Sequence, residues 1–453
     1  MPPERLSPED AQILKLESTT IAGHTCKVAI VEPQPGSQRP TVELLRERIA
    51  SRLPAEPRCR CRLAPTPLGL APPVWVEDPS FEIGNHVRRL ETDSPVSRTV
   101  FRKLVAEVMA QRLDRTRPLW QLDVVELDDG AVGLIWRLHH CMVDGVTALR
   151  LGSVLLWDGQ PDSEALPPAP GGRLREYRAI ELLALGLSYR ARRVAGAAEA
   201  RARALRPKRR ARVRNAPRSW TIVERELRPG ARSSPLDHRA GPTRAVAFAS
   251  GPLEDFKRIG HAIGPGITVN DVVLSVVAGA VRTWLEGRHA GAEGLRVKVP
   301  VSLHHHDEQP DALGNHDSYF FVDLPVAEPD PVRRLRAISL ETSARKRDHD
   351  AELLARLPLQ RTVSRWALSP HVFSFNVSNV PGPVGPLSLL GAPVRELYSL
   401  AEIAEHHALR IAVISASGTM FFGLCADGEV VGDLDVLATG IGNSLEELLE
   451  RVA

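Results

Sequence analysis

A stretch rich in proline and glycine divides this chain into two unequal parts. Residues 159–172 read GQPDSEALPPAPGG, and these residue types at such density interrupt both helices and strands. At 453 residues the chain is longer than one ordinary hydrophobic core supports. We therefore predict a mixed α/β (α+β) fold with two domains, at residues 1–158 and 220–453, joined by a linker at residues 159–219.

The predicted linker is strongly basic. The segment from Arg173 to Arg214 carries 14 Lys or Arg and three acidic residues, whereas the whole chain has a formal net charge of +3. Its apolar residues recur at steps of three or four, which predicts an amphipathic helix that Pro207 and Pro217 end. The residues of this stripe are Leu174, Tyr177, Ile180, Leu183, Leu187, Ala191 and Val194.

Three interpretations of this linker remain open. It could be a solvated helix packed through its apolar stripe, a helix that lies on a membrane surface, or a segment that binds nucleic acid. No aromatic residues are interleaved with its densest charges, so nucleic acid is the interpretation that we favour least. We predict no nucleic-acid partner.

The composition is that of a globular protein in water, with 43% hydrophobic and 25% charged residues. No apolar run reaches the ~18 residues that suggest a membrane span. The N-terminal segment MPPERLSPED lacks the apolar core of a signal peptide. The five cysteines are irregularly spaced, which favours reduced thiols and a cytoplasmic location. The sequence leaves the oligomeric state unknown.

The segment His139-His140-Cys141-Met142-Val143-Asp144-Gly145 carries the most specific chemical signal. The run from Val132 to Leu138 reads as a strand, and the run from Val146 to Leu156 reads as a helix. The histidines therefore lie at a strand-to-helix corner, and strand alternation places their side chains on opposite faces. An imidazole is well suited to accept a proton near neutral pH. Asp144 has the character of a helix N-cap, and Gly145 allows close approach of the backbone.

Other interpretations of the histidines are weaker. A polar turn with two incidental histidines would not require the complete pattern between a strand and a helix. Adjacent histidines on an extended chain diverge, so they make a poor metal site. A second run, His304-His305-His306 with Asp307 and His316, could bind metal, but we favour a polar loop between strands. We predict no metal.

The second half reads as a mixture of strands and helices without a dinucleotide-binding fingerprint. We expect helices at 253–263, 272–285 and 445–452. We expect strands at 243–248, 295–301, 319–324, 373–377, 409–415 and 419–425. The last two strands are close enough to form a hairpin through residues 416–418.

HHCMVDG resembles the HHxxxDG signature of the CoA-dependent acyltransferase superfamily, which includes chloramphenicol acetyltransferase and the condensation domains of nonribosomal peptide synthetases. Further segments resemble motifs of the bacterial wax ester synthase/diacylglycerol acyltransferase family, in family order. They are Leu6-Ser7-Pro8-Glu9-Asp10, Trp75-Val76-Glu77-Asp78 with Phe81 and His86, Leu113-Asp114-Arg115, Pro118-Leu119-Trp120, Asn270-Asp271, Pro300-Val301-Ser302 with Gly314-Asn315, and Ser378-Asn379-Val380-Pro381-Gly382-Pro383. The resemblance covers nearly the whole chain.

This resemblance implies a fold and an activity. The fold would be two chloramphenicol-acetyltransferase-like domains, each a mixed sheet flanked by helices, joined by a helical linker. The activity would be transfer of a fatty acyl group from acyl-CoA to diacylglycerol or a long-chain alcohol. Acyl-CoA would be a co-substrate, and no other cofactor is expected. Family members handle lipids, so contact with a membrane surface or lipid inclusions is also expected.

The resemblance also assigns roles to residues. His140 would be the general base, His139 and Gly145 would complete the catalytic motif, and Asp144 would brace the corner. Asn270 could donate a hydrogen bond to the oxyanion or the substrate. The remaining substrate-binding candidates are Asp271, Ser378, Asn379 and Trp120, for several of which packing is an equally good interpretation.

Several alternatives remain open. A covalent acyl-enzyme is disfavoured, because no Gly-x-Ser-x-Gly elbow occurs and Cys141 occupies a variable position of the motif. Related enzymes of secondary metabolism form esters or amides and could use a carrier-protein donor. A non-catalytic lipid-binding protein is the alternative from another class. Departures from the family pattern at residues 22–24 and 415–418 leave the choice of acceptor alcohol open.

Overall fold

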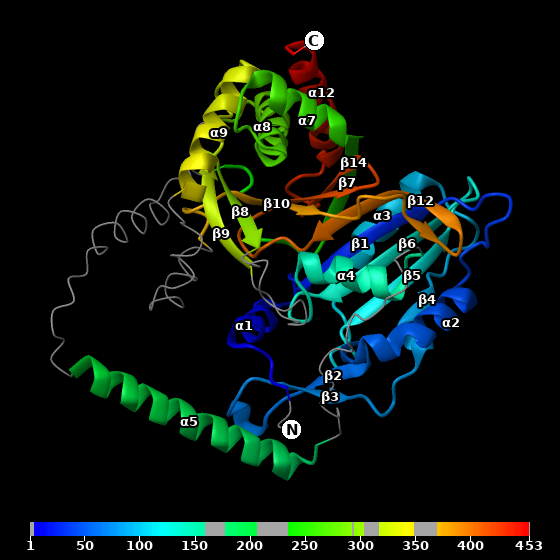
Figure 1. The fold of residues 1–453 in the computed structure, drawn as a ribbon, viewed down its shortest axis with the longest axis vertical. Coiled ribbons are helices and arrows are strands. Elements are labelled where there is room, and N and C mark those ends of the chain that lie inside the picture. Colours follow the sequence, from blue (N-terminus) through cyan, green and yellow to red (C-terminus); the bar gives the residue numbers. More distant parts are fainter. Residues whose placement is uncertain are drawn as a thin grey trace.

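The computed structural model describes residues 4–158, 177–205, 234–291, 294–302, 317–347 and 369–452. Two six-stranded sheets, each flanked by its own helices, make up most of the fold (Figure 1). Each sheet supports a large hydrophobic core. The predicted class, a mixed α/β fold built on two sheets flanked by helices, is confirmed.

The first sheet has the strand order β11-β12-β1-β6-β5-β4. Its strands are β1 (His24–Val31), β4 (Val87–Arg89), β5 (Trp120–Glu126), β6 (Val132–His139), β11 (Ser388–Leu389) and β12 (Ala392–Ala401). The helices of this half are α1 (Pro8–Leu16), α2 (Val42–Arg52), α3 (Arg98–Ala110) and α4 (Gly145–Leu155).

Helices α3 and α4 cover opposite faces of this sheet. A Cβ built on Gly133 of β6 would lie 2.4 Å from the Phe101 ring of α3. A Cβ built on Gly152 of α4 would instead lie 3.4 Å from the Trp136 ring of the same strand. Because side chains alternate along a strand, odd-numbered residues of β6 face α3 and even-numbered ones face α4.

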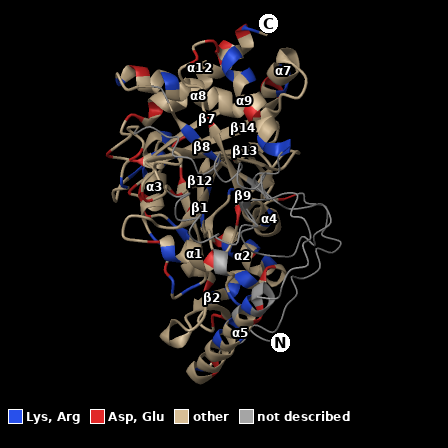
Figure 2. Ribbon diagram, turned by 90° about the vertical axis from the view of Figure 1, so that its left-hand side faces the viewer, with Lys and Arg blue, Asp and Glu red and all other residues tan. Residues whose placement is uncertain are grey.

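The second sheet has the strand order β7-β14-β13-β10-β8-β9. Its strands are β7 (Arg244–Pro252), β8 (Arg296–Ser302), β9 (Asp317–Asp323), β10 (Phe375–Pro381), β13 (Leu409–Ala416) and β14 (Thr419–Asp427). The helices α7 (Leu253–Ile263), α8 (Val269–Gly287), α9 (Pro331–Arg347) and α12 (Leu434–Glu450) form one layer on it. Figure 2 shows Lys, Arg, Asp and Glu interspersed on these helices.

The two sheets are not successive along the chain. Strands β11 and β12 lie far into the second half of the sequence, yet they extend the first sheet by antiparallel pairing of β12 with β1. The predicted division into domains at residues 1–158 and 220–453 therefore differs from the structure in one segment. Residues 388–401 lie within the predicted second domain but belong to the first sheet. The predicted boundary between the domains rests on local composition, and local composition does not reveal pairing between strands that are distant in the sequence.

A small two-stranded sheet carries the basic helix. It pairs β2 (Cys61–Ala64) with β3 (Val74–Glu77). Leu182 and Leu185 of α5 (Ala179–Leu205) pack on it, as does Tyr177, which precedes the helix. Residues 190–196 of α5 are exposed on all sides. The predicted helix end at Pro207 and Pro217 lies outside the described residues. Among the helices that the structure describes, we find none with the length and apolarity needed to span a bilayer.

The predicted elements of the second half agree with the structure in type. The helix predicted at 253–263 is α7, and the hairpin through 416–418 joins β13 to β14 with Ser417 and Gly418 at positive φ. The helix predicted at 445–452 begins earlier, since α12 starts at Leu434. The N-terminal helix α1 was not predicted; in it, Ser7 caps the first turn by accepting from Asp10 N at 2.9 Å.

Candidate functional site

The two histidines lie where buried strand β6 passes into α4. The strand ends at His139, whose backbone N–H donates to Leu119 O at 3.0 Å. Helix α4 starts after Asp144, whose side chain accepts from Thr147 N at 2.7 Å. The structure therefore shows the strand-to-helix corner, with Asp144 as the N-cap, and we call residues 139–145 the histidine corner.

His139 belongs to the α3 side of the first sheet. Its neighbour across the β1–β6 pairing is His24. The backbone N–H of Cys141 donates to Nδ1 of His139 at 3.1 Å, so a neutral ring carries its proton on Nε2. That nitrogen lies 3.7 Å from Oε2 of Glu17, and both side chains are almost fully buried.

Glu17 connects the histidine corner to the end of α1. Arg115 donates to Oε2 of Glu17 through Nε at 2.5 Å and also to Leu14 O at 2.8 Å. Burial alone would raise the pKa of the Glu17 carboxyl, but its contacts with His139 and Arg115 hold that pKa below the ordinary value. Glu17 thus places a buried negative charge beside the His139 ring, a role that no motif in the sequence signalled.

His140 is half-buried, and its backbone N–H donates to Gly23 O at 3.0 Å. Its Nε2 atom is buried and has no hydrogen-bond partner among the described residues. Burial holds the pKa of the ring well below its ordinary value, and the positive charges of Arg410 and Lys27 act in the same direction. His140 is therefore neutral near pH 7 and has one ring nitrogen available, as a general base requires.

Lys27 is a buried cation that was not predicted from the sequence. It lies in the middle of β1, is 5% exposed, and donates from Nζ to Ser399 Oγ at 2.7 Å. Its register partner Trp136 places it on the α4 side of the sheet. The available signal was a lysine inside the apolar run from Cys26 to Val31, where a solvated side chain is not expected.

Strand β10 approaches the histidine corner. A Cβ built on Gly145 would lie 3.0 Å from Cγ2 of Val380, which leaves little room for any side chain at position 145. Ser378 shares the face of β10 with Val380, whereas Asn379 lies on the other face with Val377, a residue of the second core. The alternation therefore directs Ser378, and not Asn379, toward the corner.

The structure gives Asp271 a structural role. It forms a capping box with Thr268 at the start of α8, and its Oδ1 accepts from Thr342 Oγ1 at 2.6 Å. These contacts lie in the helical layer of the second sheet, which Figure 1 shows apart from α4. Asp271 is fully buried there, so the predicted substrate-binding role does not fit it. The proposed donor role of the adjacent Asn270 remains a prediction.

Trp120 is a packing residue rather than a pocket residue. Its side chain is 2% exposed, and its indole N–H donates to Cys59 O at 2.8 Å. The ring stacks on His86 at a centroid distance of 4.6 Å, and His86 in turn stacks on Phe81 at 5.0 Å. The predicted contact of Trp120 with substrate does not fit these surroundings, because protein atoms bury the side chain almost completely.

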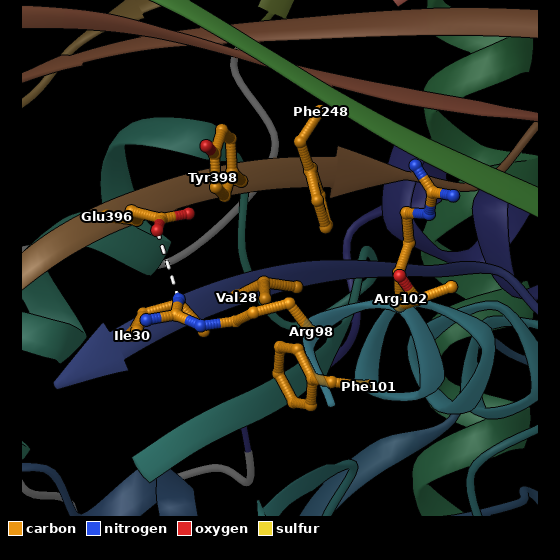
Figure 3. Close-up of a pocket in the computed structure, with 9 residues that line it drawn as sticks. Val28, Ile30, Arg98, Phe101, Arg102, Phe248, Glu396 and Tyr398 are labelled. Atoms are coloured by element: carbon orange, nitrogen blue, oxygen red, sulfur yellow. Dashed lines mark hydrogen bonds and ion pairs between the residues drawn. The ribbon is translucent and has the colours of Figure 1, made fainter. Parts of the chain in front are cut away.

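A cavity of about 240 Å³ opens on the α3 side of the first sheet (Figure 3). Apolar and charged side chains line it together, and Arg98 donates to Glu396 at 3.0 Å. The lining residues are Val28, Ile30, Arg98, Thr99, Phe101, Arg102, Phe248, Glu396 and Tyr398. Val28 and Ile30 alternate with Lys27 on β1, so this cavity lies on the opposite side of the sheet from Lys27.

A second histidine run, for which we predict a polar loop without metal, lies outside the described residues. Its residues are His304, His305, His306, Asp307 and His316. The predicted absence of metal there stays a prediction. At the histidine corner itself, the His140 ring is neutral, and the positive charges of Arg410 and Lys27 act on it.

Comparison with known protein families gives two matches along the chain. The wax ester synthase/diacylglycerol acyltransferase catalytic domain matches residues 6–273, and the C-terminal domain of the same family matches residues 313–449. A Mycobacterium tuberculosis protein that is named a diacylglycerol O-acyltransferase is 31% identical to this chain. The match covers 98% of this chain and 97% of that protein. The tgs2 protein of the same species, named a probable diacylglycerol O-acyltransferase, is 30% identical over 99% of both chains.

Solved structures show the same fold. The wax ester synthase/diacylglycerol acyltransferase of Marinobacter aquaeolei VT8 superposes with a TM-score of 0.68 at 22% identity, and 99% of each chain is covered. The first condensation domain of the CDA synthetase superposes with a TM-score of 0.62 at 15% identity, over 100% of this chain and 97% of that one. At these identities the likeness concerns the fold.

Proposed function

Because this chain belongs to the wax ester synthase/diacylglycerol acyltransferase family, we propose that it transfers a fatty acyl group from acyl-CoA to diacylglycerol or a long-chain alcohol. The family and the names of its relatives establish an acyltransferase. The donor, the acceptor and the role of His140 are the substance of the proposal. Acyl-CoA serves as co-substrate, and no other cofactor takes part.

The observation that carries the proposal is the state of His140. Its Nε2 is buried without a partner among the described residues, and its lowered pKa keeps the ring neutral. A neutral imidazole at this position accepts the proton of the acceptor hydroxyl as the oxygen attacks the thioester carbon. It then returns that proton to the departing CoA sulfur. General base catalysis of this kind contributes on the order of 10² to 10⁴ in rate.

Direct transfer is favoured over a covalent acyl-enzyme. Cys141, the thiol nearest to His140 in sequence, is 1% exposed, and burial raises its pKa far above the ordinary value. A thiol in that state is a poor nucleophile, because the thiolate is the reactive form. The acyl group is therefore expected to pass from sulfur to the acceptor oxygen in one ternary complex.

An assay panel tests the proposal. Purified protein is given palmitoyl-CoA with diacylglycerol, hexadecanol or no acceptor, and the release of free CoA and the formation of ester are measured. We expect acceptor-dependent ester formation, and His140→Ala should lower kcat by about 10² to 10⁴. Inactivity with both acceptors, but activity with an acylated carrier protein, would favour the secondary-metabolite alternative. Turnover that is unchanged in His140→Ala would contradict the role of His140.

We propose that α5 contacts a lipid surface. Ile180, Leu187 and Val194 are 73%, 55% and 70% exposed, and their spacing of seven residues aligns them along one side of the helix. Arginines that include Arg190 and Arg193 lie beside this stripe on the exposed part of α5. Figures 1 and 2 both place α5 at the opposite end of the molecule from α12. An apolar stripe flanked by arginines suits the headgroup boundary of an anionic membrane.

Sedimentation with anionic liposomes tests this contact. Replacing Ile180, Leu187 and Val194 together by Ser should release the protein from the vesicles. Leu340→Ser provides a control, since Leu340 is 74% exposed on α9 but has no such stripe. Equal binding of the triple variant and the wild type would contradict the proposal.

A further inference from the structure

A buried lysine faces the same side of the first sheet as helix α4. Lys27 is 5% exposed and pairs in register with Trp136 and with Ser399. Its charge acts on His140, and Asp144 and Arg410 act on Lys27 in turn. Alternation along β6 from Trp136, the register partner of Lys27, places His140 on the same side of the first sheet as Lys27.

The ammonium group has donor capacity that the protein does not use. A lysine carries three N–H donors. One of them donates to Ser399 Oγ at 2.7 Å, and this is the single hydrogen bond that the described residues give Nζ. No carboxylate among the described side chains lies within ion-pair distance of Nζ. Two donors therefore remain for a group that is not part of the protein.

Such an arrangement is costly in the resting protein. Burial lowers the pKa of Lys27 to about 8, because the charged form loses its hydration. A hydrophobic residue in this mid-strand position would avoid that cost. The charged ammonium group is stabilised when a negative charge develops near it in a site of low dielectric constant.

We propose that Lys27 binds the carbonyl oxygen of the acyl thioester and stabilises the oxyanion that forms there. The inference rests on the acyl transfer proposed above. The acceptor oxygen bonds to the thioester carbon, its proton passes to Nε2 of His140, and the carbonyl π electrons move onto the oxygen held by Lys27. When the carbonyl re-forms, the carbon–sulfur bond breaks and the sulfur takes the proton from His140.

Further polar groups support this placement. Arg410 and Asn376 are register partners on β13 and β10, and Ser378 and Val380 share their face of β10. Oδ1 of Asn376 is buried without a hydrogen-bond partner among the described atoms. Val380 lies against Gly145 of the histidine corner. Polar groups from the second sheet thus meet the side of the corner on which Lys27 lies.

Steady-state kinetics of Lys27→Met test the inference. Methionine keeps the apolar stem and removes the charge, so kcat should fall by about 10² to 10³ while KM for acyl-CoA changes little. Lys257→Met, a change of an exposed lysine paired with Glu254, should match the wild type. Urea unfolding should show that the Lys27→Met protein is folded and no less stable, since a buried cation has been removed.

The pH profile provides a measurement that a structural role would not change. The charged and titratable groups around Lys27 are Cys26 on its own strand, His140 and Asp144 at the corner, and Arg410 on β13. The ammonium is present below its pKa of about 8 and is lost as the pH rises through that value. Wild-type kcat should therefore fall above about pH 8, and the residual kcat of Lys27→Met should not.

Two results would overturn the inference. One is a Lys27→Met kcat within twofold of the wild type, and the other is an alkaline decline that is the same in both proteins. A wild-type protein without acyl transfer would instead contradict the proposed function itself, so the two failures are distinguishable.

Discussion

Arg244 Nε lies 2.7 Å from Oε1 of Glu402, and the two side chains are 1% and 3% exposed where the sheets meet. Arg244 is on β7 of the second sheet, and Glu402 directly follows β12 of the first. Glu402 Oε2 also accepts from Ala22 N at 3.3 Å, and its backbone N–H donates to His24 O at 3.2 Å. This buried ion pair therefore joins the two sheets beside the strand that holds Lys27.

Glu402→Ala should destabilise the protein by about 3–5 kcal/mol, because it leaves the Arg244 charge buried without its partner. Urea unfolding monitored by tryptophan fluorescence measures the change. Arg239→Ala is the matched control, since the Arg239–Glu405 pair is 77% and 58% exposed and is worth roughly 0–1 kcal/mol. Equal unfolding midpoints for the two variants would show that the buried pair does not hold the sheets together.

Glu17→Gln should lower kcat by about 10- to 100-fold with little change in KM, because the His139 ring loses the negative charge beside it and the histidine corner is held less firmly in place. Steady-state kinetics with a saturating acceptor measure the effect. Glu446→Gln, at an exposed position on α12, serves as the control. A Glu17→Gln enzyme with wild-type kcat would mean that the contact with α1 has no part in positioning the histidines.

Stability should decrease as the pH falls below about 6.5. Burial lowers the pKa of both His24 and His140 in the folded state, so the unfolded chain binds more protons in this range. Both ring nitrogens of His24 are buried without a partner among the described residues. His24→Leu should therefore reduce the difference between unfolding midpoints at pH 7.5 and pH 5.5.

His261→Asn is the control for that measurement, since His261 is exposed on α7. It should leave the pH dependence of unfolding as in the wild type. A His24→Leu protein that keeps the full wild-type dependence would show that His24 does not contribute to it.

Local features of this fold were predictable from the sequence because they depend on neighbouring residues. The corner at residues 139–145 combines an apolar strand, an N-cap side chain and an amphipathic helix, and each has its own pattern. The pairing of β12 with β1 joins residues about 370 positions apart, and no local pattern encodes it. The same limit applied to Glu17 and Lys27, whose partners His139 and Ser399 lie far away in the sequence.

For Trp120 the sequence suggested a role that the structure does not require. Its motif was predicted to bind substrate, but packing against His86 and Cys59 accounts for the residue. Trp120→Phe should keep the stack on His86 but leave Cys59 O without its donor, at a cost of about 1–3 kcal/mol. Thermal unfolding measures the loss, and KM for acyl-CoA should be unchanged. A raised KM at wild-type stability would restore the substrate-binding role of Trp120.

Gly145→Ala should disturb the contact between the histidine corner and β10, because the new Cβ would lie 3.0 Å from Cγ2 of Val380. Overpacking of this kind costs about 1–3 kcal/mol, and displacement of the corner should also lower kcat. Val380→Ala in the same chain makes room and should restore both quantities, so a double-mutant cycle measures the coupling. Gly196→Ala, where the added Cβ meets nothing within 4 Å, should be neutral or stabilising. If the effects of Gly145→Ala and Val380→Ala simply add, the corner and β10 are independent, and their packing has no functional consequence.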